Sequence, residues 1–371
     1  METRPDLDSL CCVNPDCKLF KQKGADNLKV RKLYGRDRIR FLRCRACAQE
    51  FSERKGSALF NCKITEAKAA SVIDHLDSGC GVVATATLVG VCKDTVSRLL
   101  RVCGTTSHSL HDKLVSDLWP SALQFDEKWS FTSKKQKNLS ALDDPNEVGD
   151  HWDINCIDPT TKLLISLIPG ARTAQQLHRA VADAAGRLAQ GAGRPAIFTD
   201  GEPAYEAAIK DIFGRRYPAP RSSPRGRRPG PIIRVPQDLV YAQVIKRREK
   251  GRVKEVEIRP VFGKNKLDRV IERLGWKRAN TSAIERFNLT DRDRNARKAR
   301  KSMNYSRRVR NHDAMSYISI VWYNFKHYHR SLRKQSETGG WEKRTPAMAA
   351  GLVDHQFSTL ELLRISTIGL G

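Results

Sequence analysis

The hydrophobic pattern of residues 118–212 changes repeatedly between two periods. Short apolar or alternating runs, typical of β-strands, are interrupted by longer segments whose apolar residues recur at helical spacing. The pattern predicts strands at 121–131, 151–157, 162–168 and 195–200, and helices at 174–188 and 203–212. Three strands, a helix, a strand and a helix in this order predict a mixed α/β sheet.

A different pattern precedes the sheet, because residues 63–104 have helical spacing throughout. It predicts helices at 65–76, at 82–88 and from Asp94 to a stop at Gly104. Helix, tight glycine turn and helix are typical of a helix-turn-helix reader of DNA. In that interpretation Ser97, Arg98 and Arg101 read base edges, whereas an ordinary three-helix connector would give the same pattern.

Residues 214–278 are predicted to be a basic insert that interrupts the sheet. The prolines, glycines and arginines of 221–231 exclude a helix or a central strand, and 240–247 with 252–261 predict a hairpin. The positive charge is interleaved with aromatic residues, which favours contact of Arg225, Arg227 and Arg228 with phosphate. A solvated loop is the alternative.

The insert is followed by a helix from Thr281 and by an apolar helix at 315–329 that closes the domain. The element order is that of the ribonuclease H kind of sheet. The predicted domains are an N-terminal module (1–60), a helix-turn-helix module (61–110), an α/β domain (118–335) and a C-terminal tail (336–371).

Composition and net charge restrict the classes of protein and partner that the sequence allows. The chain has 371 residues, 40% of them hydrophobic, and a formal net charge of +26, which indicates a folded protein with a polyanionic partner. Double-stranded DNA is the first candidate. The sequence shows no long apolar run, which argues against a membrane-spanning protein. Because no signal peptide is visible, we expect a reducing, cytoplasmic location, at the nucleoid of a prokaryotic cell.

The ten cysteines then favour metal binding over disulfides. Cys12 and Cys17 are separated by four residues, and Cys44 and Cys47 form a C-x-x-C pair. Paired thiolates at these spacings predict one structural Zn²⁺ ion in a ribbon. Cys11 beside Cys12 leaves the first ligand open, and four unrelated reduced cysteines are the alternative.

Three acidic residues are candidates for a second metal site. Asp126 lies within the first predicted strand, Asp200 ends a buried strand, and Glu285 opens a helix. Taken singly, each is explained by a salt bridge, and Glu285 by a capping box with Ser282. Together they would repel one another unless two Mg²⁺ or Mn²⁺ ions neutralised them. Because side chains alternate along a strand, Glu127 is expected on the opposite face from Asp126.

Three motifs resemble those of DDE transposases of the insertion sequence 1 family. They are Gln124-Phe-Asp-Glu-Lys-Trp, Phe198-Thr-Asp-Gly and Thr281-Ser-Ala-Ile-Glu-Arg-Phe-Asn-Leu-Thr-Asp-Arg, preceded by the cysteines and the helix-turn-helix pattern. The resemblance implies a ribonuclease H-like core with an N-terminal zinc ribbon and helix-turn-helix module. It implies that Asp126, Asp200 and Glu285 are catalytic, and that Asn288 and Arg292 hold phosphate.

The expected activity is that of a transposase that binds the ends of a mobile element. It would cleave phosphodiester bonds and transfer the 3′-hydroxyl ends to target DNA by two-metal catalysis, as a homodimer or a larger oligomer on DNA. A domesticated transposase acting as a sequence-specific regulator and a simple metal-dependent nuclease are the alternatives. All three acidic residues are present, which favours an enzyme over a regulator.

Overall fold

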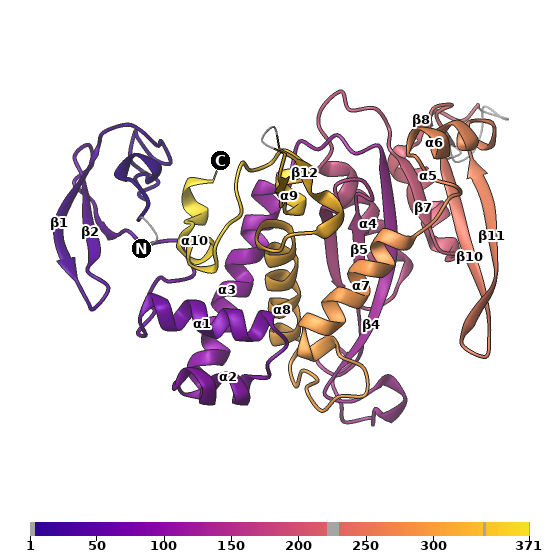
Figure 1. Cartoon of the computed structure of the whole chain (residues 1–371). Coiled ribbons are helices and arrows are strands. Elements are labelled where there is room, and N and C mark those ends of the chain that lie inside the picture. The colour runs from indigo at the N-terminus through magenta and orange to yellow at the C-terminus, as the bar shows by residue number, and fades with distance from the viewer. Residues whose placement is uncertain (1–3, 221–229, 337–338, 371) are drawn as a thin grey trace, which may run out of the picture. The chain divides into compact units, whose positions relative to one another are not determined.

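The computed structural model describes residues 4–220, 230–336 and 339–370 (Figure 1). The chain divides into two compact units. The first consists of Met1–Leu114, Arg294–Lys326 and His355–Gly371, and the second of Val115–Asp293 and His327–Asp354. The predicted catalytic region 118–335 is therefore shared between the units, because 294–326 packs with the N-terminal helices. No helix of the described residues is long and apolar enough to cross a membrane.

The N-terminal part of the first unit is a small antiparallel sheet. Its strands are β1 (Leu28–Tyr34), β2 (Ile39–Cys44) and β3 (Glu50–Ser52), in the order β1-β2-β3. Cys12, Cys17 and Cys44 pack with Leu28, Leu42 and Phe51 in a small core. So small a core leaves the cysteine cluster as a main source of stability.

The rest of the first unit is helical. Its helices are α1 (Glu66–Asp77), α2 (Val82–Val89), α3 (Lys93–Leu114), α8 (Val309–Val321), a π-helical turn (Trp322–Lys326) and α10 (Thr359–Arg364). Thr65 caps α1, and Gly90, in the left-handed conformation, ends α2. The prediction that Gly104 stops the third helix is wrong, because α3 continues through it. A Cβ on Gly104 would lie 2.4 Å from the Cβ of Ala314, so this glycine permits close approach of α3 and α8.

A buried ion cluster joins the ribbon to these helices. The Arg54 guanidinium is 2.7 Å from both Asp37 and Glu66, and Arg364 of α10 contacts the other oxygen of Glu66 at 2.6 Å. Arg54 is buried, so removal of either carboxylate would leave part of its charge without a partner.

The second unit is built on a six-stranded mixed sheet. In chain order its elements are β4 (Ala122–Thr132), β5 (Gly149–Ile157), β6 (Leu164–Gly170), α4 (Ala174–Gly186), β7 (Ala196–Thr199), α5 (Pro203–Phe213), β10 (Tyr241–Glu249), β11 (Arg252–Phe262), α6 (Leu267–Arg273) and α7 (Ser282–Arg294). The sheet order is β11-β10-β7-β4-β5-β6. β4, β7 and β10 are parallel neighbours, whereas β5, β6 and β11 pair antiparallel. The mixed α/β sheet that the sequence predicts is therefore present.

The segment 214–278 differs from the expected insert. The predicted hairpin forms, but its first strand, β10, pairs with β7 and so belongs to the sheet. The apolar residues of β10 supply the partner that a buried β7 requires on that edge. The smaller elements of the unit are β8 (Arg215–Tyr217) paired with β9 (Ile232–Arg234), β12 (Lys334–Gln335) paired with β13 (Trp341–Glu342), and α9 (Pro346–Ala349).

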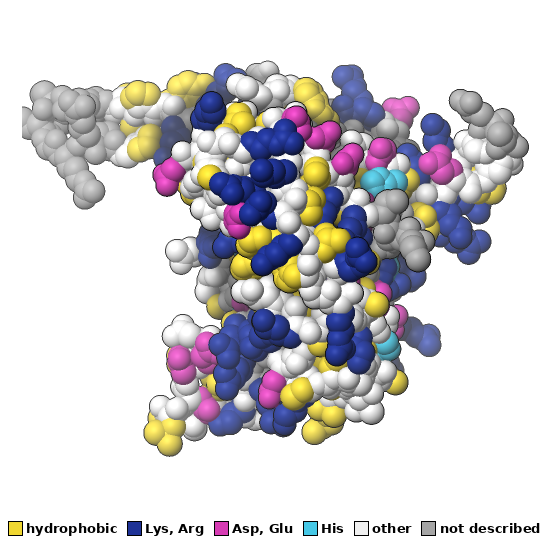
Figure 2. Space-filling view, turned by 90° about the vertical axis from the view of Figure 1, so that its left-hand side faces the viewer, with side chains coloured by type: hydrophobic (Ala, Val, Ile, Leu, Met, Phe, Trp, Pro, Cys, Tyr) yellow, Lys and Arg dark blue, Asp and Glu magenta, His cyan; other side chains and the backbone are white. Residues whose placement is uncertain are grey.

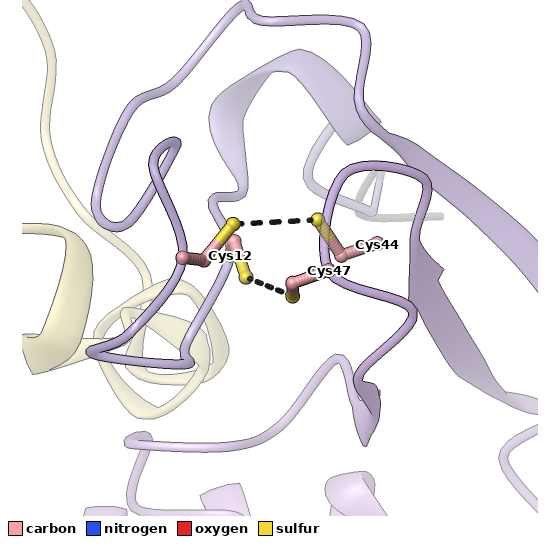
Figure 3. A group of neighbouring side chains, drawn as sticks. Cys12, Cys44 and Cys47 are labelled. Atoms are coloured by element: carbon pink, nitrogen blue, oxygen red, sulfur yellow. Dashed lines mark hydrogen bonds between the residues drawn. The ribbon is translucent and has the colours of Figure 1, made fainter.

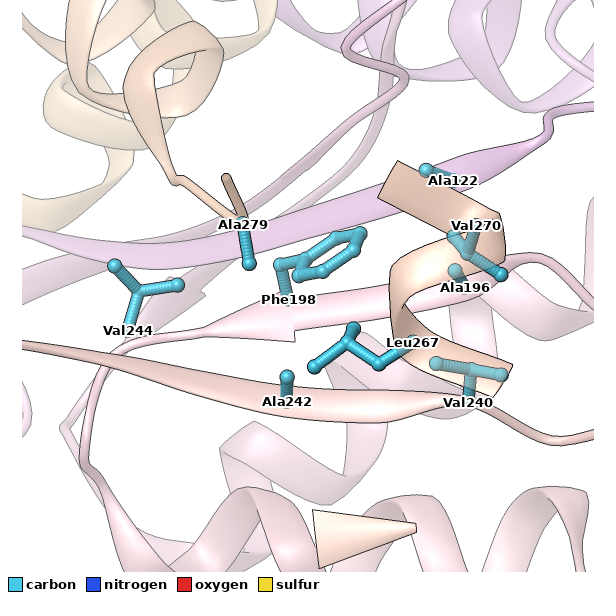
Figure 4. Close-up of a cluster of buried hydrophobic side chains, with 9 residues drawn as sticks. All are labelled: Ala122, Ala196, Phe198, Val240, Ala242, Val244, Leu267, Val270 and Ala279. Atoms are coloured by element: carbon cyan, nitrogen blue, oxygen red, sulfur yellow. The ribbon is translucent and has the colours of Figure 1, made fainter. Parts of the chain in front are cut away.

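The two faces of the sheet carry different helices. Alternate residues of three neighbouring strands, including Ala122 of β4, Phe198 of β7 and Ala242 of β10, form a core with Leu267 and Val270 of α6 (Figure 4). On the opposite face Phe125 packs against Tyr205 of α5, with ring centroids 5.7 Å apart. Even-numbered residues of β4 thus face α6 and α7, and odd-numbered residues face α5.

Candidate metal centres and catalytic site

Four cysteine sulfurs converge in the ribbon. The sulfurs of Cys12, Cys17, Cys44 and Cys47 lie within 4.8 Å of one another. Figure 3 shows the side chains of Cys12, Cys44 and Cys47 pointing toward one another. Cys12 and Cys47 are 3.6 Å apart and Cys17 and Cys44 are 3.9 Å apart, sulfur to sulfur. Tetrahedral Zn–S bonds of about 2.3 Å place sulfurs roughly 3.8 Å apart. The cluster could therefore hold a zinc ion, and Cys12, not Cys11, is the member of the set.

Hydrogen-bond donors surround these sulfurs. The Leu19 amide donates to Cys17 at 3.4 Å, and the Asn27 side chain donates to Cys44 at 3.2 Å. A backbone hydrogen bond from Gln49 lowers the pKa of Cys47 to about 6, whereas burial raises the pKa of Cys12. Such donors stabilise thiolates, the form that binds metal.

The second centre lies beside the middle of β4, where the neighbouring strand β7 ends. Carboxylate oxygens of Asp126, Glu127 and Asp200 lie within 4.8 Å of one another. Asp126 is in β4, and Asp200 follows the last residue of β7. Because β4 and β7 are parallel and Gln124 pairs with Phe198, Asp200 arrives beside Asp126. The structure thus brings together two of the three acidic residues that the sequence singled out.

The expectation that Glu127 faces away from this cluster is wrong for its carboxylate. The Cβ of Glu127 does lie on the α5 side of the sheet, as strand alternation requires. However, β7 ends at Thr199, so Asp200 lies beyond the strand end, within reach of side chains from both faces. A glutamate is long enough to bend around that open edge. Alternation fixes the direction of a Cβ but not the position of a flexible terminal group.

Burial and mutual repulsion perturb these groups. Burial, followed by the nearby Asp200 charge, raises the pKa of Asp126 from 3.8 to about 6 and that of Glu127 from 4.5 to about 8. Burial and the same three carboxylates raise the pKa of Tyr205. Arg172 lies 3.8 Å from Glu127 Oε2, and its positive charge lowers the pKa of Glu127 and so offsets part of this rise. Arg172 also forms an ion pair with Glu202 at 2.6 Å. The cluster is costly while it is not neutralised by a cation.

Glu285 lies near this cluster without being part of it. The Asp126 pKa is also raised by the charge of Glu285. The Glu285 carboxylate accepts a hydrogen bond from the Thr281 hydroxyl at 2.6 Å and forms an ion pair with Lys246 of β10. The capping box of Ser282 and Glu285, which was the alternative interpretation, does not form. The Ser282 hydroxyl instead donates to Asn280 Oδ1 at 2.6 Å.

Asn288, to which the resemblance gives a phosphate contact, hydrogen-bonds to Asp126 and Asn155. Its side chain is only 3% exposed, and its Nδ2 donates to Asp126 Oδ2 at 2.7 Å. Its Oδ1 accepts from Asn155 at 3.0 Å. Arg292, its expected companion, is half-buried on the same helix.

The carboxylate cluster fits a divalent metal by its chemistry. Oxygen ligands are those that Mg²⁺ and Mn²⁺ prefer. Glu127 Oε1 is buried and has no hydrogen-bond partner among the residues that the structure describes. Such an atom is costly unless a cation or water contacts it.

The candidate DNA-contacting residues are placed unequally. On α3, Arg98 is exposed and donates to the Asn61 carbonyl at 3.1 Å, whereas Ser97 and Arg101 are half-buried. Arg101 approaches Asn311 of α8 at 3.5 Å. Arg225, Arg227 and Arg228 lie outside the described residues. Lys and Arg side chains are spread over much of the face drawn in Figure 2, with acidic side chains between them.

Sequence reasoning missed four residues of this site, three of which lie at the acidic side chains, whereas Asn155 contacts Asn288. Glu127 was assigned to the wrong surroundings, and Asn155, Arg172 and Lys246 were not singled out. The Asp-Glu pair within a largely buried strand is the one local signal that could have indicated Glu127. The other three carry no local signal, because they reach the site from β5, from the loop after β6 and from β10.

The fold and these clusters define a mixed α/β protein with a thiolate group and a carboxylate group suited to different metals. No protein-family model and no curated protein matches the chain. Solved structures similar to it include the Mos1 strand transfer complex (15% identity, TM-score 0.17, covering 40% of this chain and 54% of that chain). They also include the Mos1 transposase paired-end complex with left transposon end (14%, TM-score 0.18, 40% and 56%) and a pre-cleavage Mos1 transpososome (11%, TM-score 0.19, 70% and 78%). The chain thus spans about half the length of the first two, and at these TM-scores the likeness carries no argument.

Proposed function

We propose that this chain is a DNA transposase of the DDE type, resembling the insertion sequence 1 family. It binds the ends of a mobile element, cleaves phosphodiester bonds and transfers the 3′-hydroxyl ends to target DNA. The observation that carries the proposal is the convergence of Asp126, from the middle of β4, and Asp200, just beyond the end of the parallel strand β7, with Glu285 close by. The order and directions of β4, β5, β6, β7 and β10 agree with the ribonuclease H-like core that the resemblance implies.

In this proposal Asp126, Asp200 and Glu285 hold two Mg²⁺ or Mn²⁺ ions, with Glu127 Oε1 as a further oxygen ligand. Such a metal pair activates the attacking oxygen of a phosphodiester transfer and stabilises the leaving oxygen. Glu285 exchanges its Lys246 partner for metal. Lys246 and Arg172 are then the cations nearest the carboxylates, and they bind the substrate phosphate.

The first unit supplies recognition. The zinc-loaded ribbon and helices α1–α3 bind element ends, and Arg98 is the exposed member of the predicted base-reading set. The net charge of +26 favours duplex DNA through the release of counterions. The arginines 225, 227 and 228 add sequence-independent phosphate contacts.

The test is a cleavage and strand-transfer assay with labelled DNA from both flanks of the coding sequence, in Mg²⁺ or Mn²⁺. Asp126→Asn, Asp200→Asn and Glu285→Gln each keep side-chain size and are expected to abolish cleavage and joining while end binding persists. Asp211→Asn is the matched control, because this half-buried acidic residue of the same unit pairs with His178 at 2.9 Å and with Arg216 at 2.6 Å, and it is not a member of the cluster. Cleavage without joining would support a nuclease, and binding alone by the wild type would support a regulator.

A further inference from the structure

A polar row on β4 faces helix α7. Gln124, Asp126 and Lys128 alternate along the strand, so their side chains share one face. All three contact α7 or the segment just before it. Polar side chains packed between a sheet and a helix are costly unless each finds a partner, so their pairing fixes how the helix lies.

The two ends of this row anchor the helix. Gln124, which is fully buried, accepts from the backbone amides of Ala283 and Ile284 at 3.1 Å each and donates to the Asn280 carbonyl at 2.8 Å. Lys128 forms ion pairs with Asp291 of α7 and, at 3.1 Å, with Asp153 of β5. These contacts satisfy the free amides at the start of α7 and set its register against β4.

The middle of the row reaches the candidate metal site. Asp126 accepts from Asn288 through Oδ2 at 2.7 Å and from the Glu127 amide through Oδ1 at 3.0 Å. Both oxygens of the carboxylate are therefore oriented by a donor. Asn288 is in turn oriented by Asn155, which donates to its Oδ1 at 3.0 Å and is fully buried.

The direction of the Asn288 amide is what matters chemically. An asparagine presents a donor at one end and an acceptor at the other. With Asn155 donating to its oxygen, the nitrogen of Asn288 must point at Asp126. The reverse orientation would place an amide oxygen against a carboxylate and leave two amide nitrogens facing each other. Since both asparagines are buried, water cannot readily replace either bond.

We propose that Asn288 is a positioning residue that orients the Asp126 carboxylate for metal binding, and that Asn155 acts through Asn288. The inference rests on the proposed function only in taking Asp126 as a metal ligand. Groups that orient metal ligands are worth about 10–100-fold in metal affinity. The role differs from phosphate contact, because the Asn288 side chain is buried.

The experiment measures Mn²⁺ binding to the full-length, zinc-loaded protein, without DNA, from the electron paramagnetic resonance signal of free Mn²⁺. Asn288→Leu keeps size and removes the donor, and we expect Mn²⁺ affinity to fall about 10–100-fold. Asn155→Ala should weaken binding in the same direction but less. In the double variant Asn155→Ala should add nothing further, because its effect passes through Asn288. Asn288→Ser is used if Asn288→Leu does not fold.

Gln243→Leu is the matched control, since it also replaces a buried amide of the same sheet, one that donates to the Tyr241 hydroxyl at 3.2 Å. It should lower thermal stability and change Mn²⁺ affinity less than about threefold. An unchanged affinity in Asn288→Leu, or an equal loss in Gln243→Leu, would overturn the positioning role. Asp126→Asn separates the two proposals: if it binds Mn²⁺ like the wild type, the metal site itself is absent and the proposed function fails.

Discussion

The thiolate cluster of the ribbon and the carboxylate cluster of the sheet are built in opposite ways. The four cysteines come from two short segments, and amide donors already point at their sulfurs. The acidic residues come from distant segments and are crowded, half-buried and partly without hydrogen-bond partners among the described residues. A metal ion bound to the cysteine cluster would stabilise the ribbon around it. The carboxylates of the second cluster repel one another and destabilise the fold, and a bound cation would offset that repulsion. A structural site and a catalytic site are expected to differ in this way.

The largest expected effect is loss of the ribbon when one thiolate is removed. Structural zinc supplies on the order of 10 kcal/mol of folding free energy in small modules. Cys44→Ser should therefore abolish zinc binding and unfold the β1–β3 sheet while the second unit stays folded. Zinc content together with limited proteolysis checks this.

Cys11→Ser is the control for that experiment, because Cys11 is buried next to Cys12 but lies outside the group of four. It should keep one zinc per chain. Equal zinc loss in the two variants would contradict the assignment of Cys12 as the ligand.

A smaller change in stability, a gain instead of a loss, is expected when one carboxylate is neutralised in the metal-free protein. The folded-state pKa values of Asp126 and Glu127, about 6 and about 8, lie above their ordinary values of 3.8 and 4.5. Between about pH 4 and pH 8 the folded protein therefore binds more protons than the unfolded chain. The contribution of these two protonated carboxyl groups to the free energy of unfolding is fully present below about pH 4 and is lost as the pH rises through about 8.

Asp126→Asn should accordingly raise the metal-free stability at pH 8 by about 1–3 kcal/mol, with little gain at pH 4. Chemical denaturation at both pH values, in chelator that leaves the zinc in place, measures it. Asp143→Asn is the opposite control, since hydrogen bonds from Lys134 and Ser140 lower the pKa of Asp143 to about 2. Its removal should not stabilise the protein, and a gain of the same size would show that the Asp126 effect is not local.

The smallest expected effect concerns the ion pair that holds Glu285. Lys246 and Glu285 are 22% and 37% exposed, so their pairing is worth at most about 1 kcal/mol. Lys246→Met should make Glu285 available to metal and tighten Mn²⁺ binding by roughly two- to fivefold. Isothermal titration of Mn²⁺ into the DNA-free protein checks the direction. Weaker binding would mean that Lys246 helps to build the metal site.

The sequence predicted most of the secondary structure because periodicity and caps are local properties. The strands from β4 to β7, helices α4 and α5 and the β10–β11 hairpin all lie where the hydrophobic pattern placed them, within a few residues. The cysteine set was also predictable, because two short spacings define it. Gly104 shows the limit, since its role as a point of contact with Ala314 depends on a helix more than 200 positions away in the chain.

The sequence by itself determined the mixed α/β class, the four cysteines whose sulfurs converge, and Asp126 and Asp200 as two carboxylates that lie together. Only the tertiary structure decided that β10 completes the sheet, that Glu127 reaches the acidic cluster and that Asn155 and Asn288 orient Asp126. The physical reason is the range of the interactions involved. Backbone preferences and ligand spacing act over a few residues, whereas the end of β7 and the packing of α7 on β4 depend on the whole fold.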